Sequence, residues 1–132
     1  MKEVLQFLND CKIFYIATNS LEGPKVRPFG FVMEDNGKLY FSTANNKDVF
    51  KQLKTDPRFE ISATSPDGMN WIRLKGKAVF DKNKALKEKA LRIEPALVSI
   101  YQTPENPLFE LFYADEVEAT VYSFMAEPKK IR

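Results

Sequence analysis

Residues 27–53 read RPFGFVMEDNGKLYFSTANNKDVFKQL, and this stretch decides the fold. This stretch and the two residues before it, Lys25 and Val26, predict a strand over 25–33. A turn over 34–37 and a second strand over 38–43 are predicted to follow. A helix is predicted to follow directly, over 48–54. Because proline cannot donate to a strand ladder, Pro28 predicts an edge or a bulge in the first strand.

The junction between the second strand and the helix predicts an anion site. Helix N-termini present unpaired N–H groups and partial positive charge to an anion. Lys47 falls in the first helical turn, where a cation opposes the helix dipole at a cost of about 0.3–1 kcal/mol. An anion between Lys47 and the helix end would remove that cost. The alternative is an ordinary capped helix with a solvated lysine, in which Asn45 is the N-cap and Asp48 completes an approximate capping box. This segment alone leaves both interpretations open.

Length and composition exclude several classes of protein. The chain has 132 residues, which predicts a single domain over 1–132. Its formal net charge of +2 argues against a nucleic-acid partner, which normally requires a strongly basic face. No apolar run approaches the roughly 20 residues of a membrane span, and the N-terminus does not read as a signal peptide. The single cysteine, Cys11, excludes an internal disulfide, so we expect a cytoplasmic protein.

The chain contains no histidine. This excludes the hydrolases that use a catalytic triad, nearly all zinc enzymes and any mechanism with imidazole as acid or base. We therefore predict no metal site and assign no catalytic side chain. If the protein is an enzyme, a cofactor is expected to carry the chemistry.

The remaining elements complete a mainly β fold with peripheral helices. Helices are predicted over 2–11 and 82–92, and a short apolar helix or turn over 96–101. Further strands are predicted over 13–18, 58–64, 69–80 and 116–124. The count is six strands in hairpin order. Such a meander cannot leave its edges open, which favours a six-stranded antiparallel Greek-key barrel.

Two other features bear on function. The strand over 69–80 places Trp71 and Arg73 on an outward, cationic face, which favours a ligand or subunit interface. The alternative is a surface aromatic covered by a loop. The apolar cluster over 108–113 is predicted as a short helix or turn that caps the core, with a dimer contact or a pocket wall as alternatives.

Three segments together carry a family resemblance: RPFGFV over 27–32, the stretch 39–53, and WIRLKGKA over 71–78. In this order and spacing they resemble the pyridoxamine 5′-phosphate oxidase-like, FMN-binding split-barrel proteins, and among them the small nitroimidazole-resistance-type members. The resemblance spans Phe7 to about Phe124. It implies a homodimer of six-stranded split β-barrels with FMN bound at the subunit interface.

The resemblance implies a phosphate site at the predicted strand–helix junction. Arg27 and Lys47 would neutralise the FMN phosphate. Thr43 and Asn46 would add hydrogen bonds at the start of the helix. This agrees with the anion site that the junction itself predicts.

The resemblance also implies contacts to the rest of the cofactor. Pro28, Phe29 and Ser42 would lie along the ribityl chain and the flavin ring. Trp71 and Arg73 would reach the flavin that is held mainly by the other subunit. The outward Trp–Arg pair and the proline in the strand are consistent with these positions.

Departures from the family pattern narrow the expected reaction. Members that oxidise pyridoxamine phosphate carry a lysine where this chain has Val32, and their longer phosphate loop has an arginine where this chain has Asn46. They also continue past the last strand into a basic substrate-binding segment, whereas this chain stops at Arg132. Vitamin-B6 oxidation is therefore not expected. Nitroimidazole-resistance proteins commonly place a histidine near the flavin, and this chain has none. Nitroimidazole reduction therefore stays open as a reaction but is not indicated.

The leading hypothesis is an FMN-dependent oxidoreductase that passes hydride or electrons from a nicotinamide cofactor to a small acceptor. Arg73 would stabilise negative charge on the reduced ring or hold an anionic substrate. Trp71 and the 108–113 aromatics would form the wall on the substrate side. The alternative is a non-catalytic protein that stores or senses flavin, or that binds deazaflavin or haem on the same barrel. Fold analogy supports the cofactor class better than the reaction.

Overall fold

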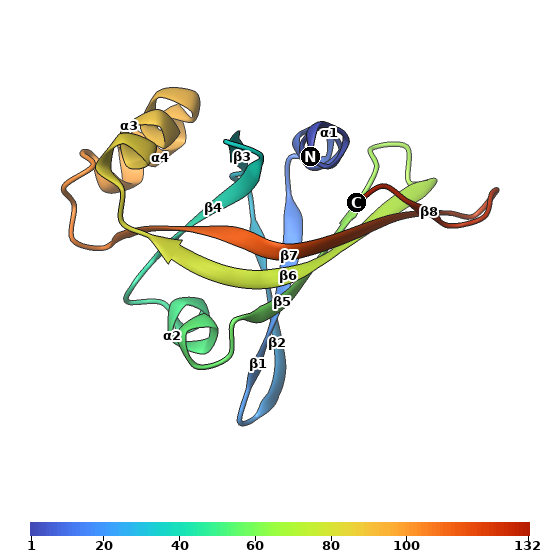
Figure 1. Cartoon of the computed structure of the whole chain (residues 1–132), viewed down its shortest axis with the longest axis horizontal. Helices are drawn as coiled ribbons and strands as arrows, with labels where there is room; N and C mark the ends of the chain where they lie inside the picture. Colours follow the sequence, from blue (N-terminus) through green and yellow to red (C-terminus); the bar gives the residue numbers. More distant parts are fainter.

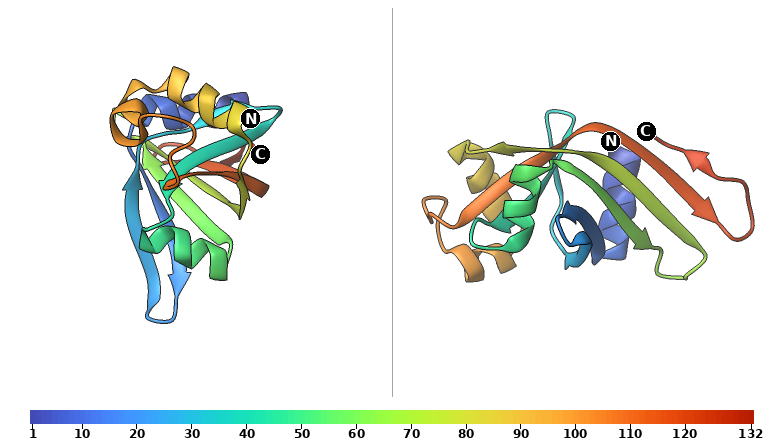
Figure 2. Two further views of the ribbon diagram at one scale, coloured as in Figure 1. Left: turned by 90° about the vertical axis from the view of Figure 1, so that its left-hand side faces the viewer. Right: turned by 90° about the horizontal axis from the view of Figure 1, so that it is seen from below.

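The computed structural model describes residues 1–132 and shows one antiparallel sheet with helices at its periphery (Figure 1). The elements follow the order α1 (Lys2–Cys11), β1 (Phe14–Ser20), β2 (Gly23–Phe29), β3 (Met33–Asp35), β4 (Lys38–Ala44), α2 (Asp48–Thr55), β5 (Arg58–Thr64), β6 (Asn70–Asp81), α3 (Lys84–Ile93), α4 (Pro95–Tyr101), β7 (Phe109–Ser123) and β8 (Lys129–Lys130). The helices α3 and α4 lie at one end of the sheet and β8 at the other (Figure 2). None of the helices is long and apolar enough to cross a bilayer.

The sheet has eight strands rather than the six predicted. The strand order is β2-β1-β5-β6-β7-β4-β3, with β8 paired to β7, and the order is open because β2 and β3 do not pair with each other. The predicted strand over 25–33 is divided, since its first part pairs with β1 and its end pairs with β4. The short strand β8 follows the last predicted strand and pairs with Thr120 and Val121. Pro28 lies on β2, which is an edge strand, as predicted.

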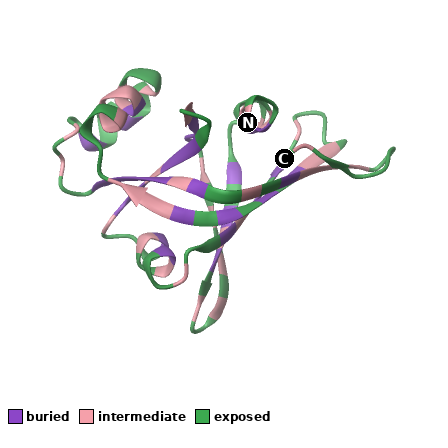
Figure 3. Cartoon of the chain, in the orientation of Figure 1, coloured by how far each residue is buried: buried purple, intermediate pink, exposed green.

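The core consists of two hydrophobic clusters. The larger one lies beneath α1 and α2, which bury residues spaced four apart: Val4 and Leu8 on α1, Val49 and Leu53 on α2. The smaller cluster joins α3 and α4 to the opposite part of the sheet and includes Phe109 and Leu111. Along β5 the burial alternates residue by residue, as the sequence predicts (Figure 3).

The strand β7 begins earlier than predicted. It runs through the apolar cluster over 108–113, where Phe109, Leu111 and Phe112 are fully buried. This cluster is therefore core strand and not a short helix. A bulge interrupts the pairing of β6 with β7 between Lys75 and Lys77 and gives β7 its bend.

Candidate functional site

A cavity of about 600 Å³ opens between β2, β4, α4, the end of α1 and the start of α2. It brings together six of the nine residues predicted to bind a cofactor: Arg27, Pro28, Phe29, Ser42, Thr43 and Lys47. Asn46 lies in the turn before α2 and does not line the cavity. Neither Trp71 nor Arg73 lines it. The segments that the sequence analysis singled out therefore meet at one place, although β6 contributes nothing to it within the same chain.

Arg27 is held in the cavity wall by neutral partners. Its Nη1 donates to Thr18 Oγ1 at 2.8 Å, and its Nη2 donates to Gln52 Oε1 at 2.6 Å. The Thr18 hydroxyl in turn donates to Gln52 Oε1 at 2.6 Å. Burial lowers the pKa of Arg27, partly offset by the carboxylate of Asp48, but a guanidinium remains charged in proteins. A fixed positive charge therefore lies at the junction of β1, β2 and α2.

The N-terminus of α2 has no side-chain cap. Lys47 is the N-cap residue, with extended backbone, and its side chain makes no cap hydrogen bond. The alternative of an Asn45 cap is wrong, because the Asn45 amide donates instead to Pro107 O at 2.6 Å and to Glu110 Oε2 at 2.9 Å. The first-turn N–H groups of α2 are thus available to an anion.

Lys47 lies immediately before the helix rather than inside its first turn. Its side chain is exposed, lines the cavity and takes part in none of the ion pairs of the chain. An ammonium group with no partner beside an uncapped helix end is suited to an anionic ligand.

Thr43 carries the one buried side-chain polar atom that has no hydrogen-bond partner, its Oγ1. The residue is 4% exposed and lines the cavity near the end of β4. Leaving a buried hydroxyl unsatisfied costs about 1–3 kcal/mol. The hydroxyl is therefore placed to bond a molecule that enters the cavity.

The opposite wall of the cavity was predicted as a short helix or turn over 96–101, but not as part of a site. It consists of α4 and the residue before it, which contribute Glu94, Leu97, Ile100 and Tyr101. The predicted wall, 108–113, lines none of the cavity. The sequence does carry a signal for α4, namely a proline at the helix start followed by apolar residues three and four apart. It carries no signal for where that helix packs.

The end of α1 also lines the cavity, through Asn9, Lys12 and Ile13. Lys12, Arg27 and Lys47 are its three cations, and Glu94 is its only acidic residue. The Glu94 carboxylate already accepts a hydrogen bond from Ala96 N at 3.0 Å. The excess of positive charge favours an anionic occupant.

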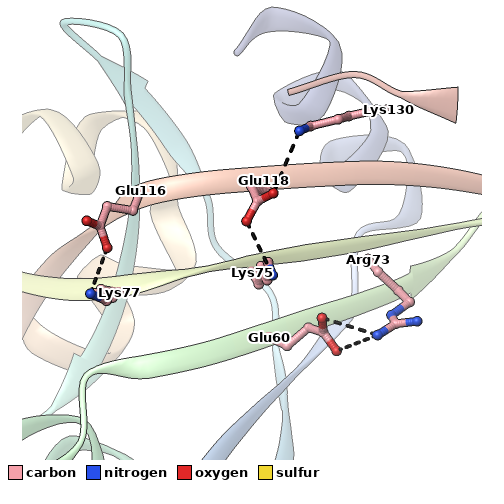
Figure 4. A network of polar contacts seen from close by, with 7 residues as sticks. All are labelled: Glu60, Arg73, Lys75, Lys77, Glu116, Glu118 and Lys130. Carbon is pink, nitrogen blue, oxygen red and sulfur yellow. Dashed lines mark hydrogen bonds and ion pairs between the residues drawn. The ribbon is translucent and has the colours of Figure 1, made fainter.

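Trp71 and Arg73 form a separate cluster on β6 and β7. The Trp71 ring stacks on Tyr122 with centroids 5.5 Å apart and also contacts Phe124. Arg73 pairs with Glu60 at 3.3 Å (Figure 4). Its guanidinium also lies over the Tyr122 ring. Phe124 belongs to the connection between β7 and β8, so a strand residue, Tyr122, and a loop residue both contact the Trp71 ring, as the interpretation of a surface aromatic covered by a loop expects. Figure 4 also shows that Lys75, Lys77 and Lys130 on this face are paired with Glu116 and Glu118.

Comparison with known proteins finds a family described as "Pyridoxamine 5′-phosphate oxidase", which matches residues 1–119. No curated protein matches the chain. Among solved structures, a NimC/NimA family protein from Clostridium acetobutylicum is 41% identical, with 98% of this chain and 90% of that chain covered and a TM-score of 0.94.

Two more distant structures share the fold. A pyridoxamine 5′-phosphate oxidase-related, FMN-binding protein from Nostoc punctiforme PCC 73102 is 18% identical, covers 96% of this chain and 85% of its own, and gives a TM-score of 0.66. A general stress FMN/FAD-binding protein from Xanthomonas citri is 14% identical. The match covers 96% of this chain and 89% of that chain, with a TM-score of 0.76.

Proposed function

Because the chain belongs to the pyridoxamine 5′-phosphate oxidase family, we propose that it is an FMN-binding oxidoreductase that passes hydride or electrons from a nicotinamide cofactor to a small acceptor. The observation that carries the cofactor assignment is the unsatisfied Thr43 hydroxyl beside the uncapped start of α2. Two proteins of the same fold are described as binding FMN or FMN/FAD, which supports a flavin on this scaffold.

The phosphate of FMN fits the end of the cavity formed by Thr43, Lys47 and α2. Phosphate oxygens accept hydrogen bonds, and this end offers a hydroxyl, an ammonium group and first-turn N–H groups with the Arg27 charge close by. Asn46, in the same turn, would add a further donor. The volume of about 600 Å³ lies within the range of small-molecule sites.

The remainder of the cofactor would lie along Pro28, Phe29 and Ser42, beneath α4. Bound FMN supplies the capacity for hydride and electron transfer, which the side chains of this protein lack. The protein itself binds and orients. Its cations neutralise the phosphate, and Leu97 and Ile100 of α4 restrict the access of water from one side.

We also propose a homodimer with a split-barrel arrangement, in which Trp71 and Arg73 of one subunit reach the flavin held by the other. Their position supports this, because both lie outside the cavity of their own chain, and Trp71 packs against the exposed aromatic Phe124. Arg73 would then place a positive charge near the ring of the partner's cofactor. The nicotinamide donor and the small acceptor would enter from the same side.

Reconstitution with FMN tests the proposal. The purified chain, incubated with FMN and freed of excess, should retain a flavin absorption spectrum at about one FMN per chain. Lys47→Ala should weaken FMN binding by about ten- to a hundredfold, because a charge-assisted contact to phosphate is lost. Lys51→Ala is the matched control, since Lys51 is an exposed residue of α2 outside the cavity. Its affinity should equal that of the wild type.

A protein that retains no flavin would overturn the cofactor assignment. Equal affinities of Lys47→Ala and the wild type would return Lys47 to the role of a solvated surface residue. Steady oxidation of a nicotinamide donor by the reconstituted protein separates an enzyme from a protein that only stores or senses flavin.

A further inference from the structure

Gln52 is a polar residue of α2 that holds Arg27 without lining the cavity itself. Its Oε1 accepts a hydrogen bond from Arg27 Nη2 at 2.6 Å and another from the Thr18 hydroxyl at 2.6 Å. Thr18 Oγ1 in turn accepts from Arg27 Nη1 at 2.8 Å. Because Arg27 does line the cavity, the Gln52 amide acts on a bound ligand through Arg27.

The Thr18 and Gln52 oxygens occupy only one end of the guanidinium. They lie 2.6 Å apart and accept from the two Nη atoms, so they bind this end as a pair of carboxylate oxygens would. The carbonyl oxygens of Ile16 and Lys25 also lie 3.3 Å from Nη1. The Nε–H and the second N–H of Nη2 bond to no atom of the chain.

The unbonded end of the guanidinium is open and faces the cavity. Thr43 Oγ1 is the only buried side-chain polar atom without a partner, so the unbonded Nε of Arg27 is not buried. Arg27 lines the cavity, whereas the hollow on the other side of Gln52, lined by Asn19 and Asp56 among others, does not include Arg27. The Nε–H and Nη2–H are therefore a pair of donors for a molecule that enters the cavity.

This pair of donors lies on the side of the cavity where α2 begins. Gln52, which holds the guanidinium, lies one helical turn after Asp48, the first residue of α2. Burial lowers the pKa of Arg27, and the Asp48 carboxylate is close enough to offset part of that effect. Lys47, the residue before Asp48, lines the same cavity. The free end of Arg27 and the uncapped helix end therefore belong to one side of the cavity.

The partners of Arg27 are neutral, unlike those of other arginines in the chain. Arg58 and Arg73 each pair with a carboxylate, at 2.7 Å and 3.3 Å. Arg27 takes part in none of the ion pairs of the chain. An amide and a hydroxyl fix the guanidinium but do not neutralise it, so its charge stays available to an anion.

From this arrangement we infer that Gln52 is a positioning residue, which turns the free end of Arg27 toward the cavity and leaves its charge unneutralised, and that it thereby sets the preference of the site for a flavin that carries a phosphate. The inference rests on the proposed function, because it takes FMN as the occupant. It assigns a role in binding to a residue that does not contact the ligand.

The test compares FMN with riboflavin, which has the same ring and ribityl chain but no phosphate. Gln52→Glu keeps the shape of the side chain and its acceptor oxygen but gives Arg27 a counterion. The dissociation constant for FMN, measured by flavin fluorescence, should rise about tenfold, because the neutralised guanidinium attracts phosphate less. The dissociation constant for riboflavin should stay unchanged.

The stability of the flavin-free Gln52→Glu variant separates positioning from a merely structural role. A part-buried guanidinium gains a carboxylate partner, which stabilises the fold. Asp48 and Asp56 lie four positions to either side on the helix, and their repulsion removes part of that gain. The melting temperature should therefore equal or exceed that of the wild type, while FMN binding weakens.

Two further variants complete the test. Gln52→Met keeps the length of the side chain and removes the acceptor, so Arg27 loses its tie to α2. Its dissociation constant for FMN should rise roughly two- to tenfold, with riboflavin unchanged. Lys51→Gln is the matched control, because it lowers the net charge by the same one unit at the neighbouring, exposed residue outside the cavity. It should bind both flavins as the wild type does.

Each contrary outcome removes a different part of the inference. Wild-type FMN affinity of Gln52→Glu would show that the neutrality of the amide does not matter. Equal weakening for FMN and riboflavin would show that Gln52 does not act on the phosphate. A Lys51→Gln variant as weak as Gln52→Glu would assign the effect to net charge and not to Arg27.

Failure of the inference and failure of the proposed function are distinguishable. If the wild type binds FMN tightly and both Gln52 variants bind it equally well, the positioning role is wrong and the proposed function stands. A wild-type protein that binds neither flavin overturns both.

Discussion

Thr18 and Thr43 are two buried threonines that differ in what their hydroxyls bond. Thr18 is 2% exposed, accepts a hydrogen bond from Arg27 and donates one to Gln52. Thr43 is buried to a similar degree and has no partner. Thr18 thus holds the Arg27 guanidinium in place in the cavity wall. The Thr43 hydroxyl is free to bond to a ligand.

This difference predicts opposite effects of the same substitution. Thr43→Val removes an unsatisfied hydroxyl with little change of shape, so the free energy of unfolding of the flavin-free protein should stay the same or rise by about 1 kcal/mol. The affinity for FMN should fall. Thr18→Val removes both hydrogen bonds of the Thr18 hydroxyl, while Arg27 and Gln52 stay bonded to each other, and should lower the free energy of unfolding by about 0.5–1.5 kcal/mol. Urea unfolding measures both, and a destabilised Thr43→Val would show that its hydroxyl is satisfied within the protein.

At the level of residues, the sequence predicts the cavity well where the contacts are local. The motif from Arg27 to Lys47 places six of the predicted residues on one cavity because two strands and a helix start follow one another directly. The Asn45 cap fails because Asn45 bonds to Pro107, which is 62 positions away along the chain. Tyr101 is missed as a lining residue for the same reason, since packing against Phe109, and not its neighbours in sequence, places it in the cavity wall.

The bulge between β6 and β7 restricts the side chain that position 76 can carry. A Cβ on Gly76 would lie 3.0 Å from Asp115 O and 3.5 Å from the Phe59 ring. At the same bulge, Glu116 adopts a positive φ of 52°. The two strands can approach closely there only because Gly76 has no side chain.

Gly76→Ala should therefore lower the free energy of unfolding by about 1–3 kcal/mol, because a backbone carbonyl cannot move away as a flexible side chain can. Gly30→Ala is the control, since its Cβ would meet nothing closer than 3.6 Å and its backbone needs no positive φ. Thermal unfolding of the flavin-free variants makes the comparison. Equal stabilities would mean that the bulge relaxes around an added methyl group.

Elements with a clear period or local stop signal are predicted closely. Helix α1 and strand β5 match their predicted bounds, and α2 differs by one residue at its end. The errors lie where pairing partners decide the outcome. The 25–33 strand is divided because its two ends join different strands, and β7 begins early because its apolar start pairs with β4. Sequence pattern alone does not specify such non-local pairing.

At the scale of the whole molecule, the positions of Lys47 and Trp71 lead to a test of the dimer. The purified chain should sediment as a dimer. If Trp71 acts across the interface, mixed dimers of a Lys47→Ala chain and a Trp71→Ala chain should regain wild-type FMN affinity at one of their two sites, because that site takes Lys47 and Trp71 from the two intact copies. Homodimers of either variant should have no site with wild-type FMN affinity.

Differently tagged chains allow the mixed dimer to be purified before titration with FMN. If Trp71 acts within its own chain, or not at all, mixing should restore no affinity beyond that of the two homodimers. A monomer that binds FMN tightly would remove the proposed role of Trp71 and Arg73 across subunits.

The cavity lies where the two hydrophobic clusters meet, with Val49 from the larger one and Phe31, Leu97 and Tyr101 from the smaller. Any ligand that binds only the folded state adds to its stability by mass action. Here a bound ligand would stabilise the contact between the two clusters. Moving α4 away from the sheet would remove one wall of the site and release the ligand, so the ligand opposes that movement. Flavin supply would thus set how often this helical unit opens, and with it the exposure of the chain to proteolysis.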